Sequence, residues 1–413
     1  MSVKFLCAIY FTFLVVRANP RKVDTLINPD CTKDCGDGIG YFKAVGAADD
    51  LHYLISSIGM PTILVVRTDQ GASVKPEIDW PKLLSRNESE IRDSITFGDK
   101  IKIKYSFAIV FPKLYEYNDT KDYADVMMYK GNATNWNIYD FTNFTWDAIG
   151  ENSNVDLNYL KIMATQQLNT TFQNGTLAFE FNSYDHEARQ NDLPHLQYNE
   201  NNTIIDFLID HVTPVFKKSR FALEAIFVSA DNTTDDMEIS VTTSIDDEYS
   251  PGVFKMTNWV TRPHNLDETG YAQWKPVCYL KSARSRSDGT KMITSPLQRN
   301  STHLDMEGLK QTIAYAYFGD KLLNMEIGGT NLSFGLSQDG FYTKTEHTAW
   351  TFLVGFGDPP QDQVSLLVII VISVGLGLPV LFIIFGGVFI CVKKHKDKKK
   401  NEDDVTSDSP SVN

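Results

Sequence analysis

An apolar segment near the carboxyl end most constrains what this chain can fold into. Residues 364–392 read VSLLVIIVISVGLGLPVLFIIFGGVFICV and contain no charged side chain. A helix rises about 1.5 Å per residue, so roughly 20 apolar residues cross the hydrocarbon core of a bilayer. Because only a helix or a closed barrel satisfies its own backbone in lipid, this segment is predicted to be a single transmembrane helix.

The residues around the apolar segments predict how the chain is oriented. Six lysines follow within residues 393–400, and positively charged residues favour the cytoplasmic side of a membrane. Residues 5–16 are apolar but too short to span, and residues 16–18 (VRA) fit a signal-peptide cleavage site better than an uncleaved anchor. We therefore expect a type I single-pass protein with four parts: a signal peptide (residues 1–18), a lumenal or extracellular ectodomain (19–363), a transmembrane helix (364–392) and a disordered cytoplasmic tail (393–413).

Acceptor sequences for N-linked glycosylation lie only between the two apolar segments. Each consists of Asn, a residue other than Pro, and then Ser or Thr. The predicted acceptors are Asn87, Asn118, Asn132, Asn143, Asn169, Asn174, Asn201, Asn232, Asn300 and Asn331. A dense glycan layer shields a backbone from proteases, which suits a protein of a degradative compartment or of the cell surface.

Charge and cysteine content narrow the class of protein further. The net charge of the whole chain is −13, and it is more negative still without the Lys-rich tail, which argues against nucleic acid as a partner. The predicted ectodomain contains three cysteines, Cys31, Cys35 and Cys278. In an oxidising compartment Cys31 and Cys35 could pair with each other, or either could pair with Cys278. So few cysteines cannot stabilise a large domain through disulfides, so the domain must be stabilised by a hydrophobic core.

The hydrophobic pattern of the ectodomain predicts a mainly β fold. Apolar and polar residues alternate in residues 101–109, 177–181, 237–241 and 313–317, as in strands with one buried face. Short apolar runs at residues 62–66 and 350–354 suit strands that are buried on both faces. Many short strands separated by turn residues favour a β-sandwich ectodomain.

A few segments interrupt this pattern. Residues 157–168 and 306–312 are the best helix candidates. Residues 189–202 are polar and break the alternation, so a seam between two lobes near residues 190–220 is one interpretation.

The sequence contains no complete catalytic motif, so we predict no catalytic, cofactor-binding or metal-binding residue. His186 and Glu187 begin a zinc-protease motif, but Gln190 stands where the second histidine is required. An acidic cluster at Asp246, Asp247 and Glu248 could bind Ca²⁺, but it lacks the spacing of a calcium loop and is better explained as a turn. A pair of carboxylates acting as a glycosidase stays an alternative.

Residues 271–279 (YAQWKPVCY) form the most distinctive aromatic string. Alternation places Tyr271 and Gln273 on one face of a strand and Ala272 and Trp274 on the other. We expect Trp274 to be a core residue; an exposed aromatic surface for a ligand is the alternative.

The chain resembles the glycosylated lysosomal membrane protein family. The matching strings include residues 244–254 (SIDDEYSPGVF), 271–277 (YAQWKPV) and 353–360 (LVGFGDPP), with further similarity in residues 44–46, 51–59 and 65–80. The resemblance implies residence in the lysosomal membrane and no enzymatic activity. It also implies that the chain is an accessory subunit of a multi-pass transporter of the major facilitator superfamily, which exports dipeptides and is protected by this subunit from lumenal proteases.

The tail departs from the family pattern. Similar proteins end in a tyrosine sorting signal, Tyr-x-x-bulky, before a terminal Asn, whereas Ser409 replaces the tyrosine here and Val412 and Asn413 follow. The chain could then reach the lysosome with its partner, or reside at the cell surface. Two other functions stay open: a cell-surface adhesion or receptor glycoprotein, and a lumenal acid hydrolase.

Overall fold

The computed structural model describes residues 20–32, 35, 38–71, 73–85, 87–129, 133–167, 174–229, 237–246, 249, 252–262, 269–282, 289–294, 304–362 and 364–406. The described residues fall into two compact units. The first lies within Met1–Ser244 and Val253–Asp362, and the second within Ile245–Gly252 and Gln363–Asn413.

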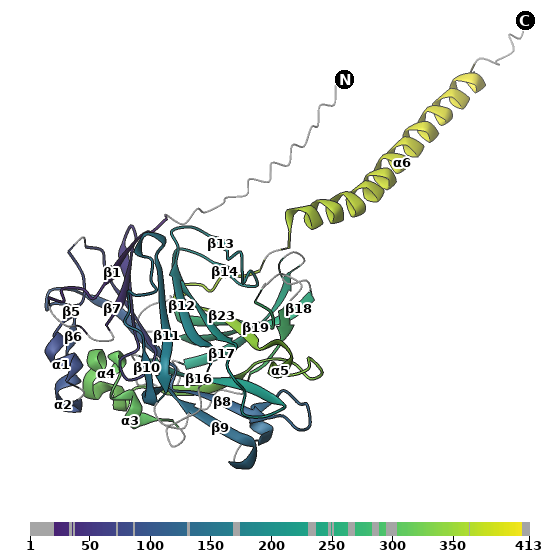
Figure 1. Cartoon of the computed structure of the whole chain (residues 1–413). Helices are drawn as coiled ribbons and strands as arrows, with labels where there is room; N and C mark the ends of the chain where they lie inside the picture. The colour runs from purple at the N-terminus through teal and green to yellow at the C-terminus, as the bar shows by residue number, and fades with distance from the viewer. Residues whose placement is uncertain are drawn as a thin grey trace, which may run out of the picture. The chain divides into compact units, whose positions relative to one another are not determined.

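The first unit contains two large antiparallel sheets, which confirm the predicted mainly β ectodomain (Figure 1). The ten-stranded sheet has the order β1 (Lys22–Ile27), β2 (Gly40–Val45), β3 (Asp49–Ser56), β4 (Thr62–Asp69), β7 (Ile103–Val110), β16 (Ser219–Ser229), β22 (Ile327–Ser333) and β21 (Ile293–Thr294). Two further strands complete it: β8 (Lys113–Asn118) pairs with β16, and β9 (Trp136–Asp140) pairs with β8.

The nine-stranded sheet lies against the first sheet. Its order is β10 (Phe144–Trp146), β11 (Tyr159–Gln167), β12 (Thr176–Ser183), β15 (Asn202–Asp210), β23 (His347–Phe356), β19 (Gly270–Tyr279), β18 (Gly252–Thr261) and β17 (Met237–Asp246), with β20 (Gly289–Lys291) paired to β19. Two short pairs stand apart, β5 (Glu77–Ile78) with β6 (Ile95–Thr96) and β13 (Ala188–Arg189) with β14 (Gln197–Tyr198).

Aromatic side chains from both sheets form the core of the sandwich. The Phe179 ring of β12 lies 4.8 Å from that of Phe207 in β15 and 5.0 Å from that of Phe111, which follows β7. All three rings are buried, and burying one phenylalanine side chain stabilises a fold by about 1.5–3 kcal/mol. Trp274 belongs to this core and Tyr271 to a separate cluster on the other face of β19. The predicted faces of this strand are therefore correct, and Trp274 is not an exposed ligand surface.

Short helices cover the other face of the ten-stranded sheet. The helices are α1 (Trp80–Leu84), α2 (Glu88–Ile91), α3 (Met306–Leu309) and α4 (Ile313–Phe318), followed by the 3-10 helix η6 (Gly319–Asn324). Leu309 and Ile313 pack with Leu64 and Ile226 of the sheet in a second core. Elsewhere lie α5 (Tyr342–Thr345) and the 3-10 helices η1 (Val126–Tyr129), η2 (Ala133–Asn135), η3 (Phe141–Asn143) and η4 (Val155–Leu157).

Two predictions of local structure were wrong. Residues 313–317 alternate like a strand but form α4. The four consecutive side chains from Ile313 to Ala316 are all buried, so the alternation of large and small residues does not distinguish a buried face from an exposed one. Residues 157–168 were expected to be helical, but residues 159–167 form β11, whose pairing with β12 overrides the local pattern. The helix expected at residues 306–312 exists only as α3.

Residues 190–220, where the sequence left a seam between two lobes open, lie inside the first unit. They contain β15, which pairs with β12 from Thr203 to Asp210. The polar segment instead contains β13 and β14, whose Ala188 and Tyr198 pack with Tyr271 on the outer face of the nine-stranded sheet.

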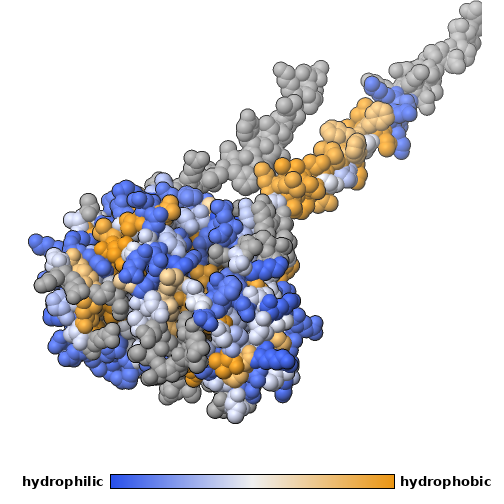
Figure 2. Space-filling view, viewed as in Figure 1, coloured by the Kyte–Doolittle hydropathy of each residue, from blue (hydrophilic) through white to orange (hydrophobic). Residues whose placement is uncertain are grey.

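The second unit contains one long helix, α6 (Leu366–Thr406). Residues 366–398 are long and apolar enough to cross a membrane, and no other helix among the described residues is. In Figure 2 this helix carries a continuous hydrophobic surface. The helix begins at Leu366 rather than residue 364, and it continues through the lysines to Thr406. The structure thus gives a helical backbone to residues 393–406, which the sequence predicted to be disordered, and an established helix extends readily into Lys and Glu residues.

Candidate functional site

Six of the predicted glycan acceptors lie among the described residues. Asn87, Asn143 and Asn174 are exposed, whereas Asn118, Asn201 and Asn331 are half-buried. Asn87 also begins α2, because its side-chain oxygen accepts a hydrogen bond from the Ser89 backbone at 3.2 Å. The other four acceptors, Asn132, Asn169, Asn232 and Asn300, lie outside the described residues.

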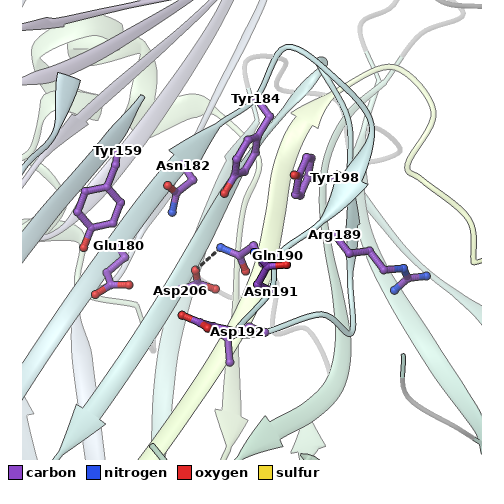
Figure 3. A pocket seen from close by; sticks show the side chains of 11 residues that line it. Tyr159, Glu180, Asn182, Tyr184, Arg189, Gln190, Asn191, Asp192, Tyr198 and Asp206 are labelled. Atoms are coloured by element: carbon purple, nitrogen blue, oxygen red, sulfur yellow. Dashed lines mark hydrogen bonds between the residues drawn. The ribbon is translucent and has the colours of Figure 1, made fainter. Parts of the chain in front are cut away.

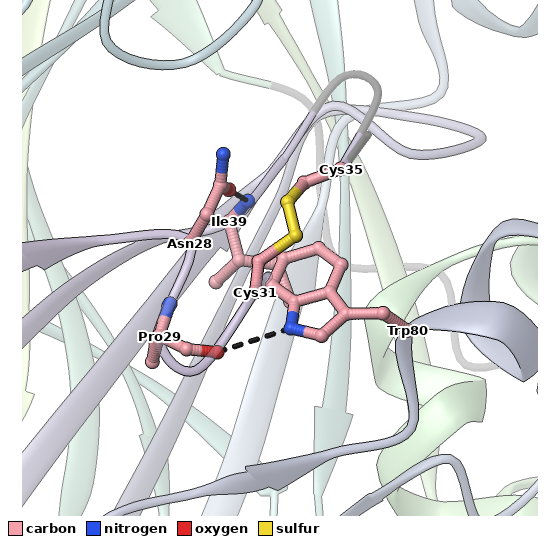
Figure 4. Close-up of a disulfide and its surroundings, with 6 residues drawn as sticks. All are labelled: Asn28, Pro29, Cys31, Cys35, Ile39 and Trp80. Atoms are coloured by element: carbon pink, nitrogen blue, oxygen red, sulfur yellow. Dashed lines mark hydrogen bonds between the residues drawn. A yellow bond between two sulfur atoms is a disulfide. The ribbon is translucent and has the colours of Figure 1, made fainter. Parts of the chain in front are cut away.

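A disulfide joins Cys31 and Cys35, which is the local one of the pairings left open by the sequence (Figure 4). It closes a short loop after β1, and the Trp80 indole beside it donates to the carbonyl of Pro29 at 3.0 Å. Cys278 stays a buried thiol in β19, and burial raises the pKa of this thiol to about 12. It therefore stays protonated and unreactive at any physiological pH.

Within the described residues, the partial zinc motif at His186 and Glu187 does not form part of a metal site. No group of three or more His, Cys, Asp or Glu side chains in the described part of the chain could hold a metal ion. His186 pairs with Asp185 at 2.8 Å, and Gln190 donates to Asp206 at 2.7 Å. The side chains of Asp246, Asp247 and Glu248 lie outside the described residues.

A cleft of about 330 Å³ opens on the outer face of the nine-stranded sheet, and it is called the outer cleft below (Figure 3). Strands β11, β12 and β15 form its floor, and the segment around β13 and β14 forms one wall. Its lining residues are Tyr159, Glu180, Asn182, Tyr184, Arg189, Gln190, Asn191, Asp192, Leu193, Tyr198 and Asp206. The outer cleft thus combines aromatic rings with many hydrogen-bonding groups.

Two stacked tyrosines form the aromatic part of the outer cleft. The rings of Tyr184 and Tyr198 lie 3.9 Å apart and within 12° of parallel. Tyr198 is buried behind, whereas Tyr184 is half-exposed and points down between Asn182 and Gln190 in Figure 3. Burial, Tyr198 and the carboxylate of Asp206 raise the pKa of Tyr184 to about 12, so its hydroxyl remains a hydrogen-bond donor.

The carboxylates on the floor of the outer cleft are held by neighbouring side chains. Asp206 is only 2% exposed and accepts hydrogen bonds from Gln190, at 2.7 Å, and from the Thr351 hydroxyl. Glu180 forms an ion pair with Lys161 at 2.8 Å. These partners fix the oxygen atoms in place and reduce the cost of desolvating them.

Arg189 in one wall of the outer cleft belongs to a buried cluster of charged side chains. Arg189 and Lys275 approach the carboxylate of Asp362 at 2.5 Å and 3.1 Å, and Ser244 donates a hydrogen bond to it. Burial raises the pKa of Asp362, but Lys275, Ser244 and Arg189 outweigh burial and hold the pKa below its ordinary value. Asp362 is the last residue of the first unit and stands four residues before α6.

Sequence reasoning did not find the outer cleft. Its floor comes from three strands that are far apart in the chain, and only pairing in the sheet brings Tyr159, Glu180 and Asp206 together. The usable signal was the mixture of aromatic and amide residues in residues 180–192 (EFNSYDHEARQND).

Comparison with known proteins identifies the family. The family model for glycosylated lysosomal membrane protein matches residues 39–397. The chain belongs to the glycosylated lysosomal membrane protein family. Glycosylated lysosomal membrane protein from Danio rerio is 33% identical over 381 residues, which cover 91% of this chain and 89% of the relative. Glycosylated lysosomal membrane protein B from Xenopus laevis is 32% identical, with 91% of each chain covered. The Homo sapiens relative is 29% identical, with 86% and 84% covered.

Membership of the glycosylated lysosomal membrane protein family confirms the resemblance that the sequence suggested. It agrees with the one candidate membrane span and assigns this chain to a family of lysosomal membrane glycoproteins. The match includes every residue of both sheets from β2 onwards and most of α6.

The exposed acceptors of this family member should carry glycans. We expect occupancy at Asn87, Asn143 and Asn174, because each side chain is exposed in the folded domain and a glycan there displaces no packed residue. Enzymatic glycan release in heavy-oxygen water, which labels each occupied position as it becomes Asp, followed by peptide mass spectrometry, checks this. Bare asparagines at all three positions would contradict the expectation.

Proposed function

We propose that this chain is a non-enzymatic accessory subunit of a multi-pass transporter of the major facilitator superfamily in the lysosomal membrane. Its ectodomain faces the lumen, where it stabilises the transporter and shields it from proteolysis. The observation that carries the proposal is the combination of family membership with one candidate span and a large acceptor-rich β domain.

The architecture of the ectodomain supports a shielding role. Proteases cleave segments that open locally, and strands paired on both sides open least. β15, β16 and β23 lie within the two sheets and are almost completely buried. Glycans on Asn87, Asn143 and Asn174 would cover exposed surface at three separate places in the chain. A domain built in this way suits long residence among lysosomal proteases.

The span offers a surface for a neighbouring helix. Ser373 and Gly377 are four residues apart and therefore lie on one face of α6, the small-xxx-small pattern that lets two helices approach closely in lipid. A Cβ added at Gly377 would meet no atom within 4 Å outside the helix's own neighbouring backbone. A Gly377→Ile substitution should therefore act mainly on a helix that packs against this face.

Deletion of this protein should shorten the lifetime of its transporter. In cells lacking the chain, we expect the half-life of at least one lysosomal transporter of the major facilitator superfamily to fall several-fold, as measured by pulse-labelling and mass spectrometry of isolated lysosomes. The same transporter should co-purify with the chain in mild detergent. Re-expression of the chain should restore the half-life, Gly377→Ile should restore it less well, and the control Leu378→Ile should restore it fully. Unchanged half-lives together with no co-purifying transporter would overturn the proposal.

A cell-surface receptor or adhesion glycoprotein is the second candidate, and the tail favours it. Ser409 stands where the family pattern places a sorting tyrosine, which motivates a test of surface residence. Surface biotinylation distinguishes the two candidates. A chain that is mostly labelled at the cell surface at steady state favours the receptor, whereas a mostly protected pool favours the accessory subunit.

The carboxylates in the outer cleft motivate the third candidate, a lumenal acid hydrolase. Glu180, Asp192 and Asp206 line the same cleft, and glycosidases use pairs of carboxylates. Turnover of glycosides or peptides by the purified chain at acidic pH, lost on Asp206→Asn substitution, would establish hydrolysis and remove the non-enzymatic proposal.

A further inference from the structure

We propose that the outer cleft binds a neutral pyranose sugar, with the ring of Tyr184 as the stacking surface. Neither the family name nor the accessory-subunit proposal assigns a ligand to this cleft. The inference rests on the geometry of the cleft alone and is independent of the partner of the membrane span.

Tyr184 has the placement that sugar stacking requires. Its back face is supported by the parallel ring of Tyr198 at 3.9 Å, so the side chain is held in one orientation before a ligand arrives. The half-exposed face carries the negative potential of the aromatic π system, which attracts the weakly positive C–H groups on one face of a pyranose ring. A preformed aromatic platform of this kind costs little entropy on binding.

The polar groups around Tyr184 match the hydroxyl groups of a sugar. Asn182 and Gln190 present amides on either side of the ring in Figure 3, and Asp192 lies exposed at the rim. Amides both donate and accept hydrogen bonds, and each sugar hydroxyl does the same. A cleft of about 330 Å³ is at the small end of ligand sites, which suits one or two sugar rings.

The charge balance of the outer cleft favours a neutral ligand over an ion. Glu180 is paired with Lys161, and Arg189 is paired with Asp362 at 2.5 Å. Asp206 is almost fully buried and accepts two hydrogen bonds from Gln190 and Thr351. The charged groups on the floor and wall are therefore already engaged within the protein, and the surface around Tyr184, with Asp192 at its rim, consists mainly of hydrogen-bonding groups and an aromatic face.

The test uses the purified full-length chain in detergent, before and after enzymatic removal of its N-glycans. The probes are methyl α-D-mannopyranoside and N,N′-diacetylchitobiose, with the cation choline as a charged comparison. Saturation-transfer NMR detects binding, and titration gives the dissociation constant. We expect at least one sugar probe to bind and choline not to bind. Binding of choline alone, or of none of the probes, would overturn the proposal.

Variants locate the binding to Tyr184. We expect Tyr184→Ala to weaken sugar binding about tenfold or more, and Tyr184→Phe, which keeps the ring, to change it by less than about threefold. Tyr123→Ala is the matched control, because Tyr123 is a 45% exposed tyrosine on another part of the domain. Asn182→Ala, which leaves the stacked rings in place, should also weaken binding. Unchanged binding by Tyr184→Ala, in protein whose tryptophan fluorescence shows that it is folded, would overturn the proposal.

The two glycan states distinguish the source of the sugar. Binding that appears only after N-glycan removal would support occupation of the outer cleft by a glycan of this chain. Equal binding in both states would support a sugar from another molecule. Both results support a pyranose site.

Discussion

Replacing Arg220 by methionine should lower the free energy of unfolding of the ectodomain by about 3–5 kcal/mol, because it leaves a buried carboxylate without its cation. The Arg220 side chain in β16 is only 1% exposed and contacts Asp119 at 2.7 Å, Asp122 at 2.7 Å and Asp339 at 2.8 Å. Asp119 is itself fully buried, so water cannot replace the lost guanidinium. Methionine keeps the apolar part of the arginine side chain. The decrease in the free energy of unfolding therefore measures mainly the effect of removing the charge.

Urea unfolding of the full chain in detergent, followed by tryptophan fluorescence, measures this loss, since Trp259, Trp274 and Trp350 are all buried in the core. Arg92→Met is the matched control. Arg92 pairs with Asp320 at 2.5 Å, but both side chains are well exposed, and water solvates them when the pair is broken. The unfolding midpoint of Arg92→Met should stay close to that of the unchanged chain. Equal losses in the two variants would contradict the role of burial.

The ectodomain should lose about 4 kcal/mol of stability between pH 7 and pH 5 through two buried histidines. Burial and the charge of Lys43 lower the pKa of His52 to about 3, and burial with Lys275 and Arg189 lowers the pKa of His195 to about 3. Below about pH 6.5 the unfolded chain binds a proton at each position, whereas the folded chain does not until about pH 3. Stability therefore falls as the pH falls through this window, by about 2 kcal/mol per histidine at pH 5.

The variant His52→Gln tests this linkage. His52 bonds to the hydroxyls of Tyr41 and Thr68 at 2.6 Å and 3.0 Å, and glutamine keeps a polar group in their place. Whatever its stability at pH 7, the variant should lose about 2 kcal/mol less than the unchanged chain on going to pH 5. His186→Gln, at an exposed position, is the control and should show the full loss. An unchanged pH difference in His52→Gln would contradict the assignment.

Buried carboxylates lose their contribution to stability only at a lower pH than the histidines do. Burial raises the pKa values of Asp49 and Asp119, but Arg21 and Arg67 at Asp49, and hydrogen bonds at Asp119, hold both below the ordinary value. Their contribution to stability is present above about pH 4 and is lost only below it. At pH 5 Asp49 and Asp119 still stabilise the fold, so they do not contribute to the loss expected between pH 7 and pH 5.

Alternation of apolar and polar residues predicted much of the fold. The strands expected at residues 101–109, 177–181 and 237–241 correspond to β7, β12 and β17, and the apolar runs at residues 62–66 and 350–354 lie in β4 and β23. These segments have a distinct buried face or lie wholly inside a sheet. The order of apolar and polar residues along each of them therefore indicates which side chains are buried. Residues 313–317 failed because a short helix buried on all sides shows the same pattern as a strand.

The outer cleft could not be predicted from the sequence for a different reason. Its floor depends on the register that sets Glu180 opposite Asp206 and Lys161, which is a property of paired strands rather than of any one segment. The Cys31–Cys35 disulfide likewise depends on the geometry of the loop, since the sequence allowed other pairings. Local patterns define elements, whereas sites of this kind arise only from their assembly.

The position of β23 has a consequence for biosynthesis. This strand lies between β15 and β19 in the nine-stranded sheet, yet it is the last strand of the ectodomain to be made. Until residues 347–356 have been synthesised, β15 and β19 of the nascent chain are two open sheet edges with unpaired backbone groups. Truncation anywhere before residue 347 should therefore yield an aggregation-prone fragment and a substrate for quality control, rather than a smaller folded domain.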